Sequence, residues 1–327
     1  MIRFESILNN ELLEFLPIRE ASLSKSAFAH DCHYLQKFDD YLVRCKCCIK
    51  ELSEDLIMGW VRSLTGKSSS IANEVIVIRI FLSRLKSIGI QVFIPSVPKV
   101  VDDYVPYIFS DMELDRIFIQ ADNISMTKSQ PNPYIQLEYP MVLRLMYGCG
   151  LRIGETLMLR MSDVDIDNGV LVLRHTKGDK QRLVPMHASL VSILRSYCMA
   201  MGLIGKTDSF LFPSTSSDTP VSTKTALHKF ENILKLCDIS LPGRRKHQRG
   251  PCLHCLRHVF TFKSFAKAEK DVRGLNDSIP YLSIYLGHDS LKETEKYLKF
   301  SSEMYPEAME LFEDYTTSIF PEVDYEK

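Results

Sequence analysis

The densest group of residues able to do chemistry is His254, Arg257 and His258. Pro251 suits the first position of a helix, so the sequence predicts a helix starting there. These three side chains then occupy positions i, i+3 and i+4 on one face of its N-terminal end. Two imidazoles and a guanidinium beside the positive end of a helix dipole are typical of an anion-binding site.

A second group lies in the stretch from Leu286 to Tyr297. Ser290 followed by Glu293 is a capping-box pattern, which predicts a helix starting at Leu291. Tyr297 lies two turns past the cap, so its ring lies on the same side of the helix as the start of the helix, next to His288. Together they would face one site that a phosphate could enter. The same pattern also fits a surface helix with a packed tyrosine, and this stretch alone leaves both interpretations open.

Arg152 is a third candidate, because Gly148 and Gly150 impose a tight turn just before it. It starts another predicted helix and has Glu155 at i+3. Either Glu155 satisfies the guanidinium, or the guanidinium presents its fork of donors to an anion.

A predicted β-hairpin supplies the fourth. The segments 170–173 and 182–185 alternate as strands do and flank a glycine turn that carries Lys177 near its tip. Lys177 could reach out to a nucleic acid or be an ordinary exposed lysine.

The distribution of charge is more informative than its total. The chain has 327 residues and a formal net charge of −1, yet residues 171–270 hold 17 Lys and Arg against 6 Asp and Glu. The last part, 271–327, holds 5 against 13. A strongly basic third followed by an acidic tail is expected of a local phosphate-binding face.

The nine cysteines are irregularly spaced, which indicates reduced thiols in a reducing compartment. Cys45–Cys48 looks helical, so its side chains point apart, and Cys252–Cys255 lacks a second paired set of ligands. We therefore expect no metal site. No apolar run is long enough for a membrane span, and the N-terminus lacks a signal-peptide core, so we expect a cytoplasmic protein.

The pattern of elements predicts a mainly α fold with a small antiparallel β-sheet. Residues 1–97 form a helical bundle, with predicted helices from His30 to Arg44, around 56–64 and from Ser68 to Gly89. A proline-containing linker covers 98–107, and an α+β domain with the acidic tail covers 108–327.

Four of these pieces, in this order, resemble the tyrosine recombinase (phage integrase) family. They are Gly150-Leu151-Arg152-Ile153-Gly154-Glu155, Thr176-Lys177-Gly178-Asp179-Lys180, His254-x-x-Arg257-His258, and Leu286-Gly287-His288 with Tyr297 nine residues on. Each piece is weak alone and the set is strong. The resemblance implies a core-binding domain that clamps DNA at 1–97 and a catalytic domain at 108–327.

The family's chemistry, carried onto these positions, implies that Tyr297 attacks a DNA phosphodiester. The attack forms a 3′-phosphotyrosyl link and releases a 5′-hydroxyl, with no metal ion, ATP or other cofactor. Arg152 and Arg257 would clamp the non-bridging oxygens, and Lys177 would act as general acid for the leaving oxygen.

Supporting roles follow from the same resemblance. His254 would assist proton transfer at Tyr297, and His288 would hydrogen-bond the phosphate and position the nucleophile. Glu155 and His258 would support these groups. The residues expected to contact DNA directly are Lys180, Arg182, Arg244, Arg245, Lys246 and Arg249.

The implied partner is double-stranded DNA at specific sites, with four copies of the chain assembled on two sites through the acidic tail. Lys180 competes with Lys177 as general acid, and Tyr305 competes with Tyr297 as nucleophile. An extra segment lies around 269–279. The leading interpretation is a site-specific recombinase of a mobile element. A type IB topoisomerase and a catalytically silent DNA-binding regulator are the alternatives.

Overall fold

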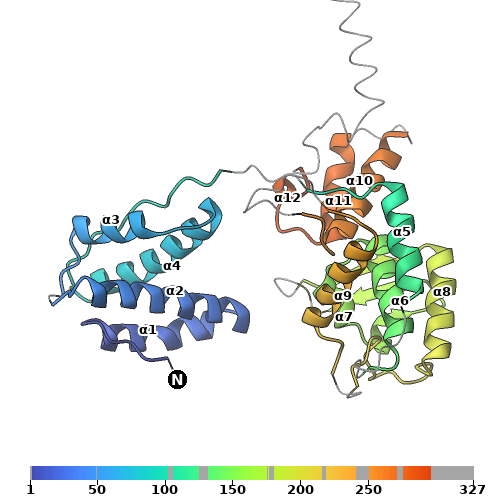
Figure 1. Ribbon diagram of the computed structural model, residues 1–327, viewed down its shortest axis with the longest axis horizontal. Helices are drawn as coiled ribbons and strands as arrows, with labels where there is room; N and C mark the ends of the chain where they lie inside the picture. The colour runs from blue at the N-terminus through green and yellow to red at the C-terminus, as the bar shows by residue number, and fades with distance from the viewer. Residues whose placement is uncertain are drawn as a thin grey trace, which may run out of the picture. The chain divides into compact units, whose positions relative to one another are not determined.

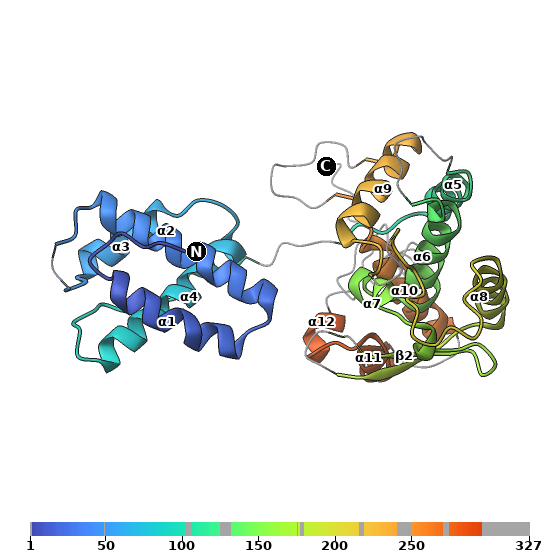
Figure 2. The same cartoon turned by 90° about the horizontal axis from the view of Figure 1, so that it is seen from below.

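The computed structural model describes residues 2–48, 50–101, 106–124, 132–174, 176, 180–215, 219–240, 250–270 and 275–295. The chain divides into two compact units, Met1–Asp103 and Tyr104–Lys327 (Figures 1 and 2). The described elements are mainly helices, together with one three-stranded antiparallel sheet. The predicted fold class is therefore confirmed. No described helix is both long and apolar enough to cross a membrane.

The N-terminal unit contains four helices in its described part: α1 (Asn9–Ser22), α2 (Lys25–Arg44), α3 (Glu54–Ser63) and α4 (Ser68–Ser87). Ser24 and Ser53 cap α2 and α3, since each side-chain oxygen accepts the backbone N–H three residues on. α1, α2 and α4 pack against one another. Phe38 meets Trp60 edge to face, with ring centroids 5.1 Å apart, in the core of the unit.

Helix α6 (Ile135–Cys149) lies at the centre of the second unit and packs against α5 (Asp111–Asp122), α8 (Ala188–Ala200) and α10 (Cys255–Lys270) (Figure 2). Most of its aliphatic residues are almost fully buried, with Leu137 exposed. α9 (Thr223–Leu236) packs on α5, and α11 (Leu275–Leu286) packs on α10. A capping box starts α5, with the side chains of Ser110 and Glu113 each accepting the other's backbone N–H.

The sheet has the order β1 (Val164–Asp165), β2 (Val170–Leu173) and β3 (Arg182–Pro185). β2 and β3 are the predicted hairpin strands, paired from Val170 opposite Pro185 to Leu173 opposite Arg182. Before β1, the chain passes through α7 (Ile153–Leu157) and the short 3-10 helix η1 (Met161–Asp163). The short helix α12 (Leu291–Glu295) follows α11 and starts at the predicted residue.

Candidate active site

The turn that ends α6 places Arg152. Gly150 caps α6 in the left-handed conformation, with φ of +61°. A Cβ at Gly150 would lie 2.5 Å from a ring carbon of Phe260, so the turn also needs glycine for space. Arg152 then stands at the N-cap of α7, where its guanidinium Nη2 donates to the carbonyl oxygen of Gly287, 3.1 Å away. The predicted glycine turn and helix start are therefore present, although Gly148 itself is helical.

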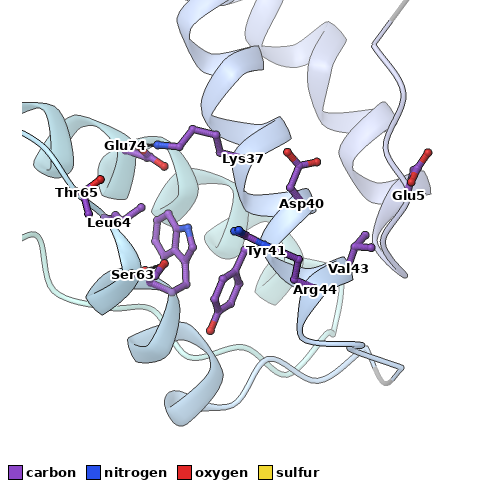
Figure 3. A pocket seen from close by; sticks show the side chains of 11 residues that line it. Glu5, Lys37, Asp40, Tyr41, Val43, Arg44, Ser63, Leu64, Thr65 and Glu74 are labelled. Atoms are coloured by element: carbon purple, nitrogen blue, oxygen red, sulfur yellow. Dashed lines mark hydrogen bonds and ion pairs between the residues drawn. The ribbon is translucent and has the colours of Figure 1, made fainter.

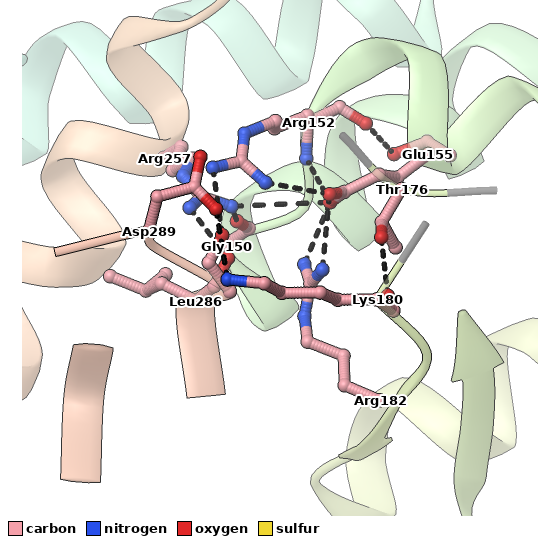
Figure 4. A network of polar contacts seen from close by, with 11 residues as sticks. Gly150, Arg152, Glu155, Thr176, Lys180, Arg182, Arg257, Leu286 and Asp289 are labelled. Atoms are coloured by element: carbon pink, nitrogen blue, oxygen red, sulfur yellow. Dashed lines mark hydrogen bonds and ion pairs between the residues drawn. The ribbon is translucent and has the colours of Figure 1, made fainter. Parts of the chain in front are cut away.

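Glu155 is the centre of the polar network (Figure 4). Arg152 donates to it from its backbone N–H at 3.0 Å and from Nη1 at 2.8 Å. Arg182 donates through both terminal nitrogens, at 3.1 and 2.7 Å. The Glu155 side chain is only 3% exposed. Burial alone would raise the pKa of this carboxyl, but the hydrogen bonds and charges of Arg182 and Arg152 outweigh burial and lower the pKa.

Arg257 is held from the opposite side of the site. It is 1% exposed, and its two terminal nitrogens donate to the carbonyl oxygens of Gly150 at 2.7 Å and Leu286 at 2.8 Å. Its Nη1 also lies 4.0 Å from the Glu155 carboxylate. Arg257 thus joins the turn after α6 to the turn after α11, two segments far apart in the sequence.

The helix that carries Arg257 starts later than predicted. α10 begins at Cys255 rather than at Pro251, because the residues from Pro251 to His254 form a turn. The carbonyl oxygen of His254 still accepts the backbone N–H groups of Arg257 and His258, at 3.1 and 3.3 Å. His254 and His258 therefore remain neighbours, with ring centroids 4.7 Å apart in an edge-to-face contact.

His288 lies in the turn between α11 and α12, directly after Gly287, whose φ is +65°. Its Nδ1 is 2.7 Å from the hydroxyl of Thr294, a fully buried residue of α12. Burial first, and then the charges of Arg257 and Arg152, lower the pKa of His288 to about 3. The imidazole is therefore neutral near pH 7. It can exchange hydrogen bonds with a phosphate and a hydroxyl without adding charge.

The hairpin contributes two basic residues to the described network. Lys180 forms an exposed ion pair with Asp289 at 3.0 Å. Arg182 was predicted to contact DNA, but its side chain is 10% exposed and its terminal nitrogens are bound to Glu155. Arg182 therefore lies within the polar network around Glu155, and its contact with DNA stays a prediction. The alternation of side chains along β3 indicates this inward position, because Arg182 faces the same side of the strand as the buried Val184.

The remaining predicted site residues lie outside the described part of the chain. They are Lys177, Arg244, Arg245, Lys246, Arg249 and Tyr297, together with the alternative nucleophile Tyr305. The extra segment around 269–279 is described only in part, as the end of α10 and the start of α11.

The cysteine clusters do not assemble a recognisable metal centre. Cys45–Cys48 was predicted to be helical, but α2 ends at Arg44 and Lys46 has a φ of +50°. The Sγ atoms of Cys252 and Cys255 are 3.6 Å apart at the start of α10. Within the described ranges, no cluster of three or more His, Cys, Asp or Glu side chains could hold a metal ion.

The described site therefore gathers Arg152, Arg182 and Arg257 around a single carboxylate, that of Glu155. His288 adds no charge near pH 7, because its pKa is about 3. Cationic charge in excess of anionic charge, held in a partly desolvated position, is what an anionic ligand such as a phosphodiester requires.

Comparison with known proteins shows which family the sequence matches. The family model described as "Phage integrase family" matches residues 118–304, more than half of the chain. Protein y4rB of Sinorhizobium fredii, named as a candidate integrase/recombinase, is 34% identical over 220 residues. That match covers 64% of this chain and 66% of y4rB. Tyrosine recombinase XerD of Proteus mirabilis is 29% identical over 188 residues, which are 56% of this chain and 54% of XerD. The chain thus matches less than two thirds of the length of these relatives.

Two solved structures share the fold. The XerH site-specific recombinase bound to the palindromic difH substrate, a post-cleavage complex, aligns with a TM-score of 0.68 and 20% identity. That alignment covers 88% of this chain and 80% of XerH. A lambda integrase dimer bound to a COC′ core site aligns with a TM-score of 0.63 and 17% identity, over 88% of this chain and 94% of that one.

Proposed function

The chain belongs to the phage integrase family of tyrosine recombinases, and we propose that it is a site-specific recombinase that cuts and rejoins DNA through a tyrosine nucleophile. The observation that carries this proposal is the cationic surplus around Glu155. Three guanidinium groups from α7, β3 and α10 meet one carboxylate at the N-terminal end of α7. Phosphoryl transfer depends mostly on positioning and on stabilising the charge of the transferred group, which such a cluster provides.

In the proposed reaction, the Tyr297 hydroxyl oxygen attacks the phosphorus of a DNA phosphodiester. A new P–O bond forms to the tyrosine as the bond to the 5′-oxygen breaks, and the leaving oxygen takes a proton from Lys177. His254 accepts the tyrosine proton. A 5′-hydroxyl of a second strand then attacks the 3′-phosphotyrosyl link, which restores Tyr297 and joins the strands.

The described residues support distinct parts of this scheme. Arg152 is half-buried and carries a forked guanidinium, which suits two non-bridging oxygens of one phosphate. Arg257 supplies a fixed buried charge close by, while its carbonyl partners hold it in place. His288, neutral and anchored to Thr294 of α12, would hydrogen-bond the phosphate and set the position of the segment that leads to Tyr297. Glu155 and His258 would orient these groups.

We further propose that the DNA is double-stranded and is bound at specific sites as part of the movement of a mobile element. XerH is described with its difH substrate, and a lambda integrase tetramer is described on a Holliday junction. By analogy, four copies of this chain would assemble on two DNA sites, each tail docking on a neighbour. The basic run Arg244, Arg245, Lys246 and Arg249, with Lys180, would contact DNA phosphates.

The test uses a pool of randomised DNA duplexes, each carrying a nick that traps a cleaved strand. The full chain is incubated with the pool, and DNA that survives detergent on the protein is sequenced. We expect covalent adducts that are enriched for one DNA sequence and that form equally well in the presence of EDTA. The Tyr297→Phe variant should form no adducts but should still bind the enriched duplex. Adducts from Tyr297→Phe would refute the assignment. Relaxation of a supercoiled circle without exchange between two duplexes would favour the topoisomerase alternative.

A further inference from the structure

Arg182 lies at the junction of three segments that are distant in the sequence. It is the first residue of β3 and pairs with Leu173 of β2, so it lies at the end of the hairpin ladder nearest the connection between the two strands. Its two terminal nitrogens bind both oxygens of Glu155. The same carboxylate holds the backbone and the guanidinium of Arg152. The hairpin and the start of α7 are thus tied through one buried carboxylate (Figure 4).

The third segment is the turn at Gly287. A Cβ built on Gly287 would lie 2.8 Å from Nη1 of Arg182 and 3.2 Å from its Cζ. The guanidinium therefore packs directly against the backbone of the turn that presents His288. On the same residue, the carbonyl oxygen accepts a hydrogen bond from Nη2 of Arg152. Two arginines therefore contact Gly287, and both of them also bind Glu155.

Stability alone does not explain an arginine at this position. The Arg182 side chain is 10% exposed, and its Nε is buried with no hydrogen-bond partner among the described residues. A buried donor left unsatisfied destabilises a fold, and well-packed apolar residues commonly replace buried ion pairs without loss of stability. The presence of the charged side chain at this buried position therefore points to a role in arranging the site.

We infer that Arg182 is a positioning residue that locks the hairpin, the Arg152–Glu155 pair and the Gly287–His288 turn into one geometry. This inference rests on the proposed function. Arg182 touches no reacting atom. It keeps Glu155 ionised and fixed, and Glu155 in turn fixes the guanidinium of Arg152. It also sets the turn from which α12 leads toward Tyr297. The same side chain aligns with the phosphate site the end of β3 that follows the segment carrying Lys177.

The charged groups that face Glu155 make this role measurable as a pH effect. They are Arg152 from α7, Arg182 from β3 and, at 4.0 Å, Arg257 from α10, with His288 nearby in the turn. Arg182 contributes the largest of the hydrogen-bond effects that lower the pKa of Glu155 against burial. Without Arg182, burial would act on Glu155 with less opposition, so its pKa would rise and Glu155 would protonate more readily as the pH falls.

The hairpin offers a matched control. Arg174 follows β2 and pairs with the buried carboxylate of Asp163 at 2.7 Å. Arg182→Met, Arg182→Lys and Arg174→Met are compared with the wild-type chain. The first readout needs no DNA: hydrogen exchange followed by mass spectrometry. Arg182→Met should speed exchange in both 182–186 and 284–291, whereas Arg174→Met should affect only the residues around Asp163.

The second readout is single-turnover cleavage of the enriched duplex, expressed as a ratio to wild type at each pH. For Arg182→Met we expect a loss of about tenfold to a hundredfold near pH 6, as for lost hydrogen bonds to a charged group, and a markedly smaller loss near pH 8.5. Arg182→Lys should recover part of the rate. Adding Glu155→Gln to Arg182→Met should abolish the pH dependence of the ratio.

The outcomes separate the two proposals. If the wild-type chain forms no adduct, the proposed function fails, and exchange still decides whether Arg182 couples the hairpin to the turn. If adducts form but Arg182→Met matches Arg174→Met in exchange and loses the same factor at every pH, Arg182 is an ordinary structural residue and the inference is overturned.

Discussion

Each unit of the chain buries a glutamate beside basic side chains, and the two carboxylates differ in what surrounds them. In the N-terminal unit, Glu74 meets one cation, with Lys37 Nζ 2.5 Å from one oxygen, at a pocket of about 560 Å³ (Figure 3). Its other oxygen is buried without a hydrogen-bond partner among the described residues. In the second unit, Glu155 accepts hydrogen bonds on both oxygens from Arg152 and Arg182.

The difference concerns the balance of charge. Glu74 and Lys37 neutralise each other, so this pair does not need a charged ligand to balance it. Around Glu155, the positive charge exceeds the negative charge, and Arg257 adds to the excess. Buried charge without a counterpart is costly unless a ligand supplies that counterpart. The difference is consistent with the proposed anion binding at the Glu155 network, and we expect a structural role for the Glu74 pair.

The largest expected effect comes from changing the fork of Arg152. Arg152→Lys keeps the charge but cannot donate two parallel hydrogen bonds to one phosphate, nor hold Glu155 and Gly287 together. We expect single-turnover cleavage of the enriched duplex to fall about a hundredfold to a thousandfold, the range for loss of a donor to developing charge. Near-normal cleavage would mean that Arg152 only stabilises the fold.

The two glutamates can be compared directly. Glu155→Gln keeps the size of the side chain but removes the charge that orients two arginines, so cleavage should fall about tenfold to a hundredfold. Glu74→Gln should leave cleavage unchanged and cost about 1 kcal/mol or less of stability, as for a partly exposed ion pair. Cleavage rates and urea unfolding measure the two effects. Equal losses of cleavage would remove the distinction between the two sites.

The prediction for His288 is smaller and concerns pH. Its folded pKa of about 3 lies below the ordinary value of 6.5, so the unfolded chain binds this proton more readily. The contribution of neutral His288 to the free energy of unfolding is therefore fully present above about pH 6.5, and it is lost as the pH falls toward 3. Hydrogen exchange in α10 and α11 should therefore accelerate more between pH 7 and pH 5 in wild type than in His288→Gln, after correction for intrinsic rates. Parallel changes would contradict a buried neutral imidazole.

Local chemistry explains what the sequence could reveal. The hairpin strands β2 and β3, the start of α12 at Leu291 and the glycine turn before Arg152 depend on neighbouring residues, and all were predicted. The start of α10 was predicted too early. Pro251 suits the first position of a helix, but here a turn separates it from the first helical residue, Cys255. The carbonyl partners of Arg257 could not be predicted, since Gly150 and Leu286 approach it only through packing of distant helices. The bonds of Arg182 to Glu155 were not predicted, because they depend on its inward register in β3 and on the packing of α7 against the sheet.

The most direct measurement is to identify the residue that carries the DNA. The covalent adduct from the enriched duplex is digested with protease and nuclease, and the modified peptide is sequenced by mass spectrometry. We expect a nucleotide linked through its 3′-phosphate to the hydroxyl of Tyr297 in the wild-type chain. The Glu155→Gln variant should give the same linkage at a reduced yield. A nucleotide on Tyr305 or another residue, or retention of the enriched duplex with no covalent adduct, would contradict it.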